Sequence, residues 1–168
     1  MKLRELTEKD EKAFGKWIDA WRVEKDYVVW QAKPIETTFA EHLVELEKFK
    51  NNPPTPRIPS TQYFLFEDDE IVACAFCRWE LRKDDPFHSH IGYGVLPDRR
   101  GEGLAKYVLG LALDLYRERG ISRVLVTNDD WNAASQRTAI ACGGVFEKEE
   151  IEPETGDRVR FYWIDLGE

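Results

Sequence analysis

The stretch that decides the fold lies in the middle of the chain, where residues 90–106 read His-Ile-Gly-Tyr-Gly-Val-Leu-Pro-Asp-Arg-Arg-Gly-Glu-Gly-Leu-Ala-Lys. Its first half alternates apolar residues with glycines, which is typical of a strand, and Pro97 ends that strand. From Leu104 to about Arg119 the apolar residues follow helical spacing. We therefore predict a strand, a short turn and a helix, with the turn at the amino-terminal end of the helix.

The turn between this strand and this helix, residues 99–103, is basic and contains two glycines. Unpaired backbone amides converge at the start of a helix, where the positive end of the helix dipole also favours an anion. Gly101 and Gly103 let a phosphate approach the backbone closely, while Arg100 and Lys106 add positive charge. The turn therefore predicts a pyrophosphate site.

Size and charge restrict the class of protein. The 168 residues suit one domain, 1–168, with a hydrophobic core, and a composition of 33% charged and 42% hydrophobic residues indicates a soluble globular chain. No apolar run is long enough to cross a bilayer and the start has no signal-like segment, so we expect a cytoplasmic protein without a membrane partner. The net charge of −8 argues against nucleic acid and mildly favours a cationic or neutral substrate.

Outside the central stretch, further strands and helices alternate along the chain. Strands are predicted at residues 1–6, 62–66, 71–81, from 87, 121–127, 145–148 and from 159, and helices at 7–21, 34–50, 104–119 and 132–142. This order favours an α/β fold of the α+β type, with a mixed sheet and helices on both faces. The unit from 87 to 127 is predicted to be a right-handed parallel crossover.

The cysteines and histidines give no metal site. Cys74 and Cys77 lie three apart in a predicted strand, so their side chains point to opposite faces, and no second pair is present to complete a zinc site. His88 and His90 have a spacing that suits a metal, but no convergent third ligand is evident. We expect no metal cofactor.

Two motifs resemble those of one known family. Residues 100–105, Arg-x-x-Gly-x-Ala, resemble the coenzyme A motif of the GNAT superfamily of N-acetyltransferases. Residues 132–135, Asn-Ala-Ala-Ser, followed by Gly-Gly-Val-Phe at 143–146, are similar to a second GNAT segment, and the combination looks like a bacterial group of predicted acetyltransferases. The resemblance implies the GNAT fold, with a mostly antiparallel central sheet and a parallel pair formed by the fourth and fifth strands.

The resemblance also implies acetyl-CoA as cosubstrate and assigns residues to it. The backbone of Tyr93, Gly94 and Val95 would pair with the pantetheine arm, and the Val95 N–H would polarise the thioester carbonyl. Gly92 and Gly94 suit a bulge that splays the fourth strand from the fifth. The implied cofactor-binding set is Tyr93, Gly94, Val95, Arg100, Gly101, Glu102, Gly103, Leu104, Ala105, Lys106, Asn132 and Ser135.

The implied reaction is direct attack of an amine on the thioester. An amine with a pKa near about 10 must first lose a proton, so a base is needed. His90, at the start of the motif strand, is the best candidate, and His88 shares its predicted strand face. The predicted catalytic residues are therefore His90 and Val95.

The general acid has no obvious candidate. A tyrosine commonly stands in the middle of the helix after the fifth strand in this family, and the matching position here is Ala139. Ser135, Thr138, Cys142 or water can substitute for it. Ala139 therefore leaves open a non-catalytic acyl-CoA-binding or sensing module, and a protein-interaction domain without coenzyme A is a second alternative.

The acceptor is expected to be a primary amine of a small molecule or of a peptide or protein, and the chain a monomer or a homodimer. His88, Trp30 and Trp79 are candidates for the acceptor pocket, since aromatic faces attract cations. Structural roles remain open as well. The glycine turn can be only a tight connection, Asn132 can be only a helix cap, and either histidine can be structural.

Overall fold

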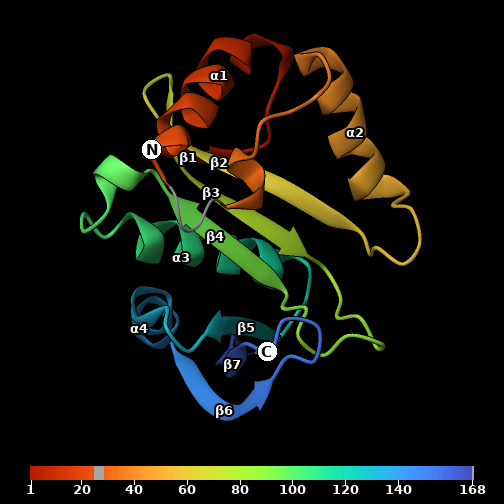
Figure 1. Cartoon of the computed structure of the whole chain (residues 1–168), viewed down its shortest axis with the longest axis vertical. Coiled ribbons are helices and arrows are strands. Elements are labelled where there is room, and N and C mark those ends of the chain that lie inside the picture. Colours follow the sequence, from red (N-terminus) through yellow and green to blue (C-terminus); the bar gives the residue numbers. More distant parts are fainter. Residues whose placement is uncertain (25–28, 168) are drawn as a thin grey trace.

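The structure, a computed structural model, describes residues 1–24 and 29–167 (Figure 1). Its helices are α1 (Glu11–Ala20), α2 (Phe39–Asn51), α3 (Leu104–Glu118) and α4 (Ala133–Ala141), with 3-10 turns η1 (Glu8–Asp10), η2 (Trp21–Val23), η3 (Trp30–Ala32) and η4 (Pro97–Arg99). Its strands are β1 (Lys2–Arg4), β2 (Ser60–Glu67), β3 (Glu70–Arg78), β4 (Ile91–Val95), β5 (Arg123–Asp129), β6 (Gly144–Ile151) and β7 (Arg158–Asp165).

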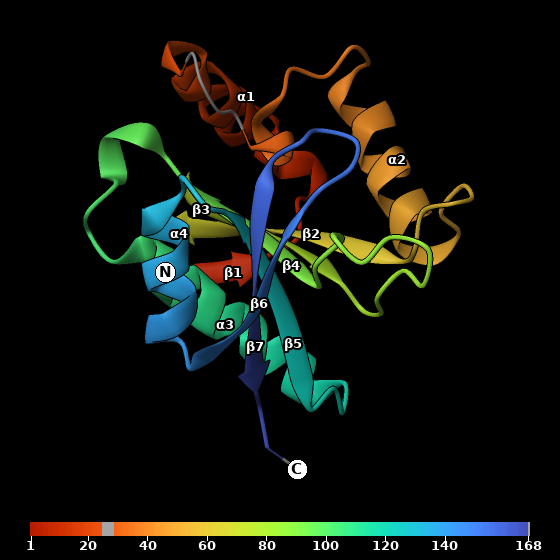
Figure 2. The ribbon, with the colours of Figure 1, turned by 60° about the horizontal axis from the view of Figure 1, so that its bottom comes forward.

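The strands form two antiparallel sheets. One has the order β1-β2-β3-β4 and the other β5-β7-β6. Helices α1 and α2 cover one face of the four-stranded sheet and α3 covers the other, as Figures 1 and 2 show from two directions. The mixed α/β fold with helices on both faces is therefore confirmed. The single domain over 1–168 stays a prediction.

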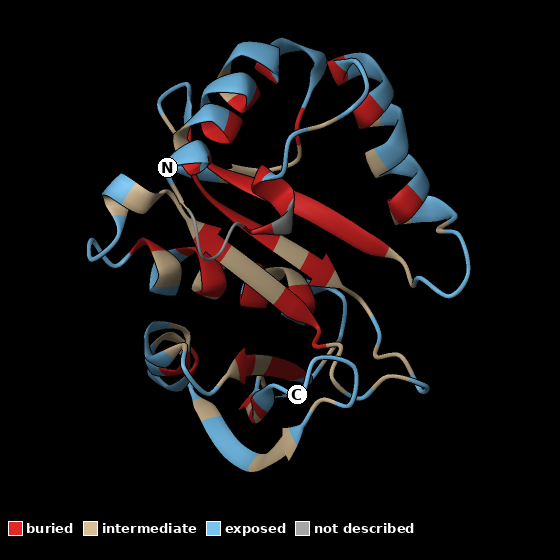
Figure 3. Ribbon diagram, in the orientation of Figure 1, coloured by how far each residue is buried: buried red, intermediate tan, exposed pale blue. Residues whose placement is uncertain are grey.

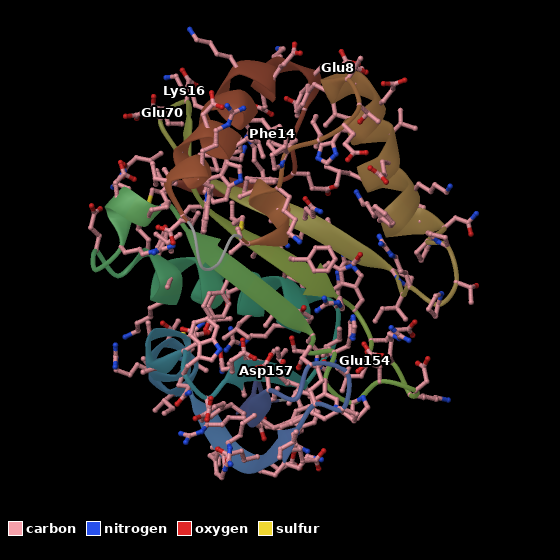
Figure 4. All side chains as sticks on the ribbon, in the orientation of Figure 1. Glu8, Phe14, Lys16, Glu70, Glu154 and Asp157 are labelled. Atoms are coloured by element: carbon pink, nitrogen blue, oxygen red, sulfur yellow. The ribbon has the colours of Figure 1, made fainter. Side chains whose placement is uncertain are left out.

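Two hydrophobic cores lie on the two faces of the four-stranded sheet, and Figure 3 shows the buried positions turned toward it. Under α1, the ring of Phe14 lies 5.5 Å from Phe39 and 5.9 Å from Phe64 (Figure 4). On the opposite face, α3 buries the apolar stripe that the sequence predicted. Cys74 belongs to the first core and Cys77 to the second, so these thiols do point to opposite faces.

Element boundaries differ from the predicted ones where side chains decide them. Helix α2 begins at Phe39 rather than at 34, because the Thr38 hydroxyl accepts a hydrogen bond from the Glu41 amide (3.3 Å) and the Glu41 carboxylate accepts one from the Thr38 amide (2.9 Å). Strand β6 reaches from Gly144 to Ile151 and is longer than predicted, because it pairs with β7 along its whole length.

The junction between the two sheets differs most from the prediction. Strand β4 begins at Ile91 rather than at 87, because the His90 amide donates to the Leu125 carbonyl (3.0 Å) in β5. No ladder joins β4 to β5 in the described residues, so the predicted parallel pair is not confirmed. The register of β3 against β4 runs without a shift, so that pairing contains no bulge, and the predicted bulge that splays β4 from β5 stays a prediction.

None of the helices in residues 1–24 and 29–167 combines the length and the apolar character that a membrane span requires.

Candidate active site

A cleft lies where β4 and β5 separate, and it has a volume of about 560 Å³. Its walls come from β4, from the end of β5, from the start of α4 and from the first turn of α3. The two sheets meet at His90 and Leu125 but share no ladder beyond that point, so the edge of β4 is left uncovered. The cleft is therefore a consequence of the missing β4–β5 ladder.

The edge of β4 presents backbone groups to this cleft. The Leu96 amide donates to Val72 (3.0 Å) and the Arg78 amide to His90 (2.7 Å), so the even-numbered residues of this segment pair with β3. By alternation, Tyr93 and Val95 direct their N–H and C=O groups to the opposite edge, which borders the cleft. The predicted pairing positions are thus available.

Gly94 has a different role from its neighbours. Its backbone faces β3, and a Cβ built on it would lie only 2.5 Å from Cγ1 of Val29. Val29 lines the cleft, so the absence of a side chain at Gly94 lets this residue pack directly against β4. Glycine is needed here for close approach.

The turn before α3 has the predicted form. Gly101 and Gly103 have φ angles of 86° and 80°, in the left-handed region that favours glycine. The helical hydrogen bonds of α3 begin with Tyr107 N–H to Gly103 C=O (3.1 Å), so the amides from Leu104 to Lys106 precede them. No acidic side chain lies in the first turn of α3. An anion is therefore favoured at this position.

All three charged residues of the turn already have partners. Glu102 accepts from Arg99 (2.8 Å), which also binds Glu67 (2.9 Å). Arg100 pairs with Glu24 at 3.2 Å, and both residues line the cleft. A bound phosphate would compete with Glu24 for the Arg100 guanidinium.

A hydrogen-bonded chain crosses the cleft from β4 to β5. The Tyr93 hydroxyl lies 2.9 Å from the Ser135 hydroxyl, which in turn donates to the Asn128 side-chain oxygen. Asn132 caps α4, because its side-chain oxygen accepts from the Ser135 amide (3.1 Å). Asn132 and Ser135 therefore both lie in the cleft wall, as predicted.

Sequence reasoning missed two cleft residues, Asn128 and Trp21. Both are buried and both line the cleft, yet the Asn128 amide nitrogen and the Trp21 indole nitrogen have no hydrogen-bond partner among the described residues. Buried donors without a partner are uncommon, so each points to a ligand group. The available signal for Asn128 was an amide at the end of a continuous apolar strand.

The position of His90 corrects its assignment as the base. Its Nδ1 accepts from the Leu125 amide (2.9 Å), and its carbonyl accepts from the Tyr116 hydroxyl (2.6 Å). Burial, followed by the nearby positive charge of Arg78, lowers the pKa of His90 to about 4. His90 lines neither the cleft nor the cavity beside it, and it holds β5 and α3 to the start of β4.

His88 lies elsewhere, because β4 has not yet begun at this residue and the two histidines do not share a strand face. It lines a second cavity that adjoins the cleft. Its Nδ1 contacts the Asp85 carboxylate, which leaves Nε2 directed away from that ion pair. A histidine oriented by a carboxylate is a common arrangement for a general base.

Of the predicted substitutes for the missing acid, Ser135 and Thr138 line the cleft and Cys142 does not. Ala139 is fully buried, and the Cys142 thiol lies against the Lys106 carbonyl (3.7 Å) outside the cleft. The Thr138 hydroxyl donates within α4 to Ala134 (3.0 Å). Ser135 remains, and it lies beside the Tyr93 phenol.

Of the aromatic residues predicted for an acceptor pocket, Trp79 lines neither the cleft nor the cavity that contains His88. The Trp79 indole donates to Thr61 (3.2 Å) and stacks under the Arg119 guanidinium at 3.8 Å, beside Tyr116 of α3. Trp79 is thus packed on the α3 side of the sheet rather than in a pocket. The side chain of Trp30 lies outside what the structure describes.

The thiols and potential metal ligands are not organised for metal chemistry. Burial raises the pKa of Cys77 to about 12 and that of Cys74 further. Within the described parts of the chain, no three His, Cys, Asp or Glu side chains converge on one point.

Comparison with known families identifies the class. The model of the acetyltransferase (GNAT) family matches residues 17–143, so the chain belongs to this family. It is accordingly an N-acetyltransferase, as the two motifs predicted.

Solved structures share the fold. An acetyltransferase of the GNAT family from Streptococcus pneumoniae is 18% identical with a TM-score of 0.71, and the match covers 99% of both chains. The ribosomal-protein-S5-alanine acetyltransferase from Vibrio fischeri is 16% identical (TM-score 0.72; 99% of this chain, 93% of that one). A Salmonella typhimurium protein solved with its cofactor acetyl-CoA is 16% identical (TM-score 0.67; 99% and 94%). No curated protein sequence matches the chain.

Proposed function

We propose that this enzyme transfers the acetyl group of acetyl-CoA to a primary amine of a small molecule or peptide by direct attack. The observation that carries the proposal is the uncovered edge of β4. There Tyr93 and Val95 direct backbone groups into a 560 Å³ cleft that begins at the glycine turn of α3. A cleft with a strand edge on one side and a helix start at its end suits an extended ligand that carries a diphosphate.

Three groups of residues in the cleft wall would each bind a different part of acetyl-CoA. The amides from Arg100 to Lys106 bind the diphosphate, and the β4 edge pairs with the pantetheine amides. The Asn128 amide nitrogen and the Asn132 side chain offer donors from the opposite wall. The Val95 N–H is aimed at the thioester carbonyl, where a preorganised donor stabilises the oxyanion of the transition state.

We assign the base to His88 in place of His90. In the reaction, the amine gives a proton to His88 Nε2, its nitrogen bonds to the acetyl carbon, and the carbon–sulfur bond breaks. Asp85 contacts Nδ1 and stabilises the imidazolium that forms. Asp129 is the second candidate, because it lines the cleft and burial, with Asp157 and other acidic neighbours, raises its pKa.

The leaving thiolate takes a proton, and we assign the donor to Tyr93. Its hydroxyl is the phenol that the described cleft wall offers, and it lies 3.0 Å from the Ser135 carbonyl, to which it donates, and 2.9 Å from the Ser135 hydroxyl. The tyrosinate that forms then recovers a proton from solvent water. Tyr93 would thus replace the tyrosine that is absent at Ala139.

Thermal unfolding with coenzyme A tests the cofactor site. Saturation at about one hundred times Kd stabilises a protein by about 2.7 kcal/mol. Replacing Gly101 and Gly103 with Val should abolish this stabilisation, since β-branched residues resist positive φ. Gly120→Val is the matched control, because Gly120 also has positive φ but ends α3 far along the helix from the turn. If coenzyme A stabilised the Gly101/Gly103 variant as much as it stabilises the Gly120→Val control, the assignment of the diphosphate site would be wrong.

A turnover assay distinguishes an acetyltransferase from a non-catalytic module that only binds acyl-CoA. Release of coenzyme A in the presence of an amine supports transfer, and loss of kcat in His88→Asn but not in Asp129→Asn supports the choice of base. Binding of acetyl-CoA without transfer to any amine favours a sensing module, which the alanine at 139 makes a real alternative.

A further inference from the structure

The cavity that contains His88 has a volume of about 360 Å³ and adjoins the acetyl-CoA cleft. The two spaces share Val29, Gly92 and Tyr93 in their walls. A cavity of this size suits a small molecule. With the thioester placed along β4, a molecule seated in this cavity would present its amine at Gly92 and Tyr93, next to the carbonyl that it attacks.

Three arginines and one histidine line this cavity. They are Arg57, from the loop after α2; Arg78, from the end of β3; and Arg82 and His88, from the segment between β3 and β4. No described Asp or Glu lines the cavity. The local charge is therefore opposite in sign to the net charge of −8 of the chain.

Acidic side chains that do not line the cavity contact two of these groups, Arg82 and His88. Arg82 pairs with Asp84 (2.7 Å) and lies 3.6 Å from Asp85, which also contacts His88. These carboxylates offset the charge of Arg82 through close contacts, whereas Asp85 acts on Arg78 only from a longer distance.

Arg57 and Arg78 have no carboxylate within ion-pair distance in the part of the chain that the structure describes. The Arg78 guanidinium donates to the Ser89 carbonyl (2.8 Å) and lies 4.7 Å over the Phe76 ring. Arg57 lies 4.7 Å over the Phe49 ring. Both planes are thus held at the wall by aromatic faces, which is an arrangement that leaves a guanidinium edge for a planar or tetrahedral anion.

Burial lowers the pKa of Arg78, which means that its surroundings resist a positive charge. The more distant Asp85 carboxylate attracts this guanidinium but does not offset its burial, so an anionic ligand in direct contact would lower the cost of holding the charge there.

We propose that the acceptor is a small zwitterionic amine whose carboxylate or phosphate binds Arg57 and Arg78 in this cavity. The proposal rests on acetyl transfer as the function of the adjoining cleft. The same positive charges also favour the neutral form of the amine, which is the form that attacks the thioester. A polyamine, by contrast, would place like charges beside the arginines.

Matched amines test the proposal in a coupled assay of coenzyme A release. β-Alanine is compared with propylamine to test a carboxylate, and O-phosphoethanolamine with ethanolamine to test a phosphate. Ethylenediamine is added as an amine that carries a second positive charge. The anionic member of at least one pair should have kcat/KM roughly tenfold to a hundredfold higher, as expected for a charge-assisted hydrogen bond.

Variants of Arg57 test whether this residue causes the preference for anionic amines. Arg57→Gln should reduce the preference by about tenfold, and Arg57→Glu should shift it toward ethylenediamine, a gain that misfolding cannot produce. Arg117→Gln, on the exposed last turn of α3, is the matched control and should keep the preference.

The outcomes separate the two proposals. Turnover with equal or greater preference for neutral or cationic amines overturns the zwitterionic acceptor and leaves acetyl transfer standing. Binding of acetyl-CoA with no transfer to any amine of the panel overturns acetyl transfer, and this inference with it.

Discussion

Acid should weaken the fold through one buried imidazole, that of His90. The folded protein holds the pKa of His90 near 4, because burial and the Arg78 charge disfavour the imidazolium, whereas the unfolded chain has the ordinary value near 6.5. At neutral pH both states are unprotonated and His90 contributes no pH dependence. As the pH falls below 6.5, His90 is protonated in the unfolded chain but not in the folded protein. The free energy of unfolding therefore falls until the pH reaches about 4, where the folded protein is protonated as well.

The size of the effect follows from these two pKa values. Between about pH 7 and about pH 5, the His90 contribution to the free energy of unfolding should fall by roughly 2 kcal/mol. This is a sizeable share of the stability of a domain of this size.

Urea unfolding at both pH values measures the loss, with His90→Asn as the reference. The Asn side-chain oxygen can accept the Leu125 N–H in place of Nδ1 but does not titrate. The other buried histidine, His42, whose pKa is also lowered by burial, is present in both proteins and cancels. The variant should lose about 2 kcal/mol less than the natural sequence over this interval.

The same variant tests the role of His90 in chemistry. His90→Asn should keep its acetyl-transfer activity at pH 7, since the imidazole lies outside the cleft and the cavity. Equal pH dependence of stability in the two proteins would refute the buried-imidazole argument. Loss of kcat in a variant of normal stability would return His90 to the role of base.

Three further predictions concern the frame around the cleft. Gly94→Ala should destabilise the protein by about 1–3 kcal/mol through overlap with Val29; Val29→Ala added to it should restore part of the loss, and simple additivity would contradict the contact. Asp10→Asn should lower the free energy of unfolding at neutral pH by roughly 2 kcal/mol, because the Arg4 hydrogen bonds lower the pKa of Asp10 to about 2. This difference from the natural protein should shrink as the pH falls from about 4 toward 2, because the natural carboxylate is then protonated. Tyr93→Phe should lower kcat by about a hundredfold with the KM for acetyl-CoA nearly unchanged, and an unaltered kcat would exclude the phenol as proton donor.

Much of the fold could be predicted from local patterns in the chain. The positive φ of Gly101 and Gly103, the apolar stripe of α3 and the Asn132 cap depend on residues within a few positions of one another. Patterns of this range are visible in the sequence because backbone strain, helical periodicity and capping act over one or two turns.

The difference between the two histidines depends on contacts of longer range. His88 and His90 are two residues apart and look equivalent in the chain. The Leu125 amide, in a strand 35 residues away, donates a hydrogen bond to Nδ1 of His90 and holds that ring in the interior, while the His88 ring lies in a cavity. Burial and desolvation, which determine the pKa, exist only once these segments have packed together.

The sequence by itself therefore determined the family, the turn that suits a diphosphate and the helices on both faces of the sheet. Only the tertiary structure decided the charge of the cavity that contains His88, because Arg57, Arg78 and Arg82 come from separate segments of a chain whose net charge has the opposite sign. An electrostatic potential depends on distances in space, and composition contains none of those distances.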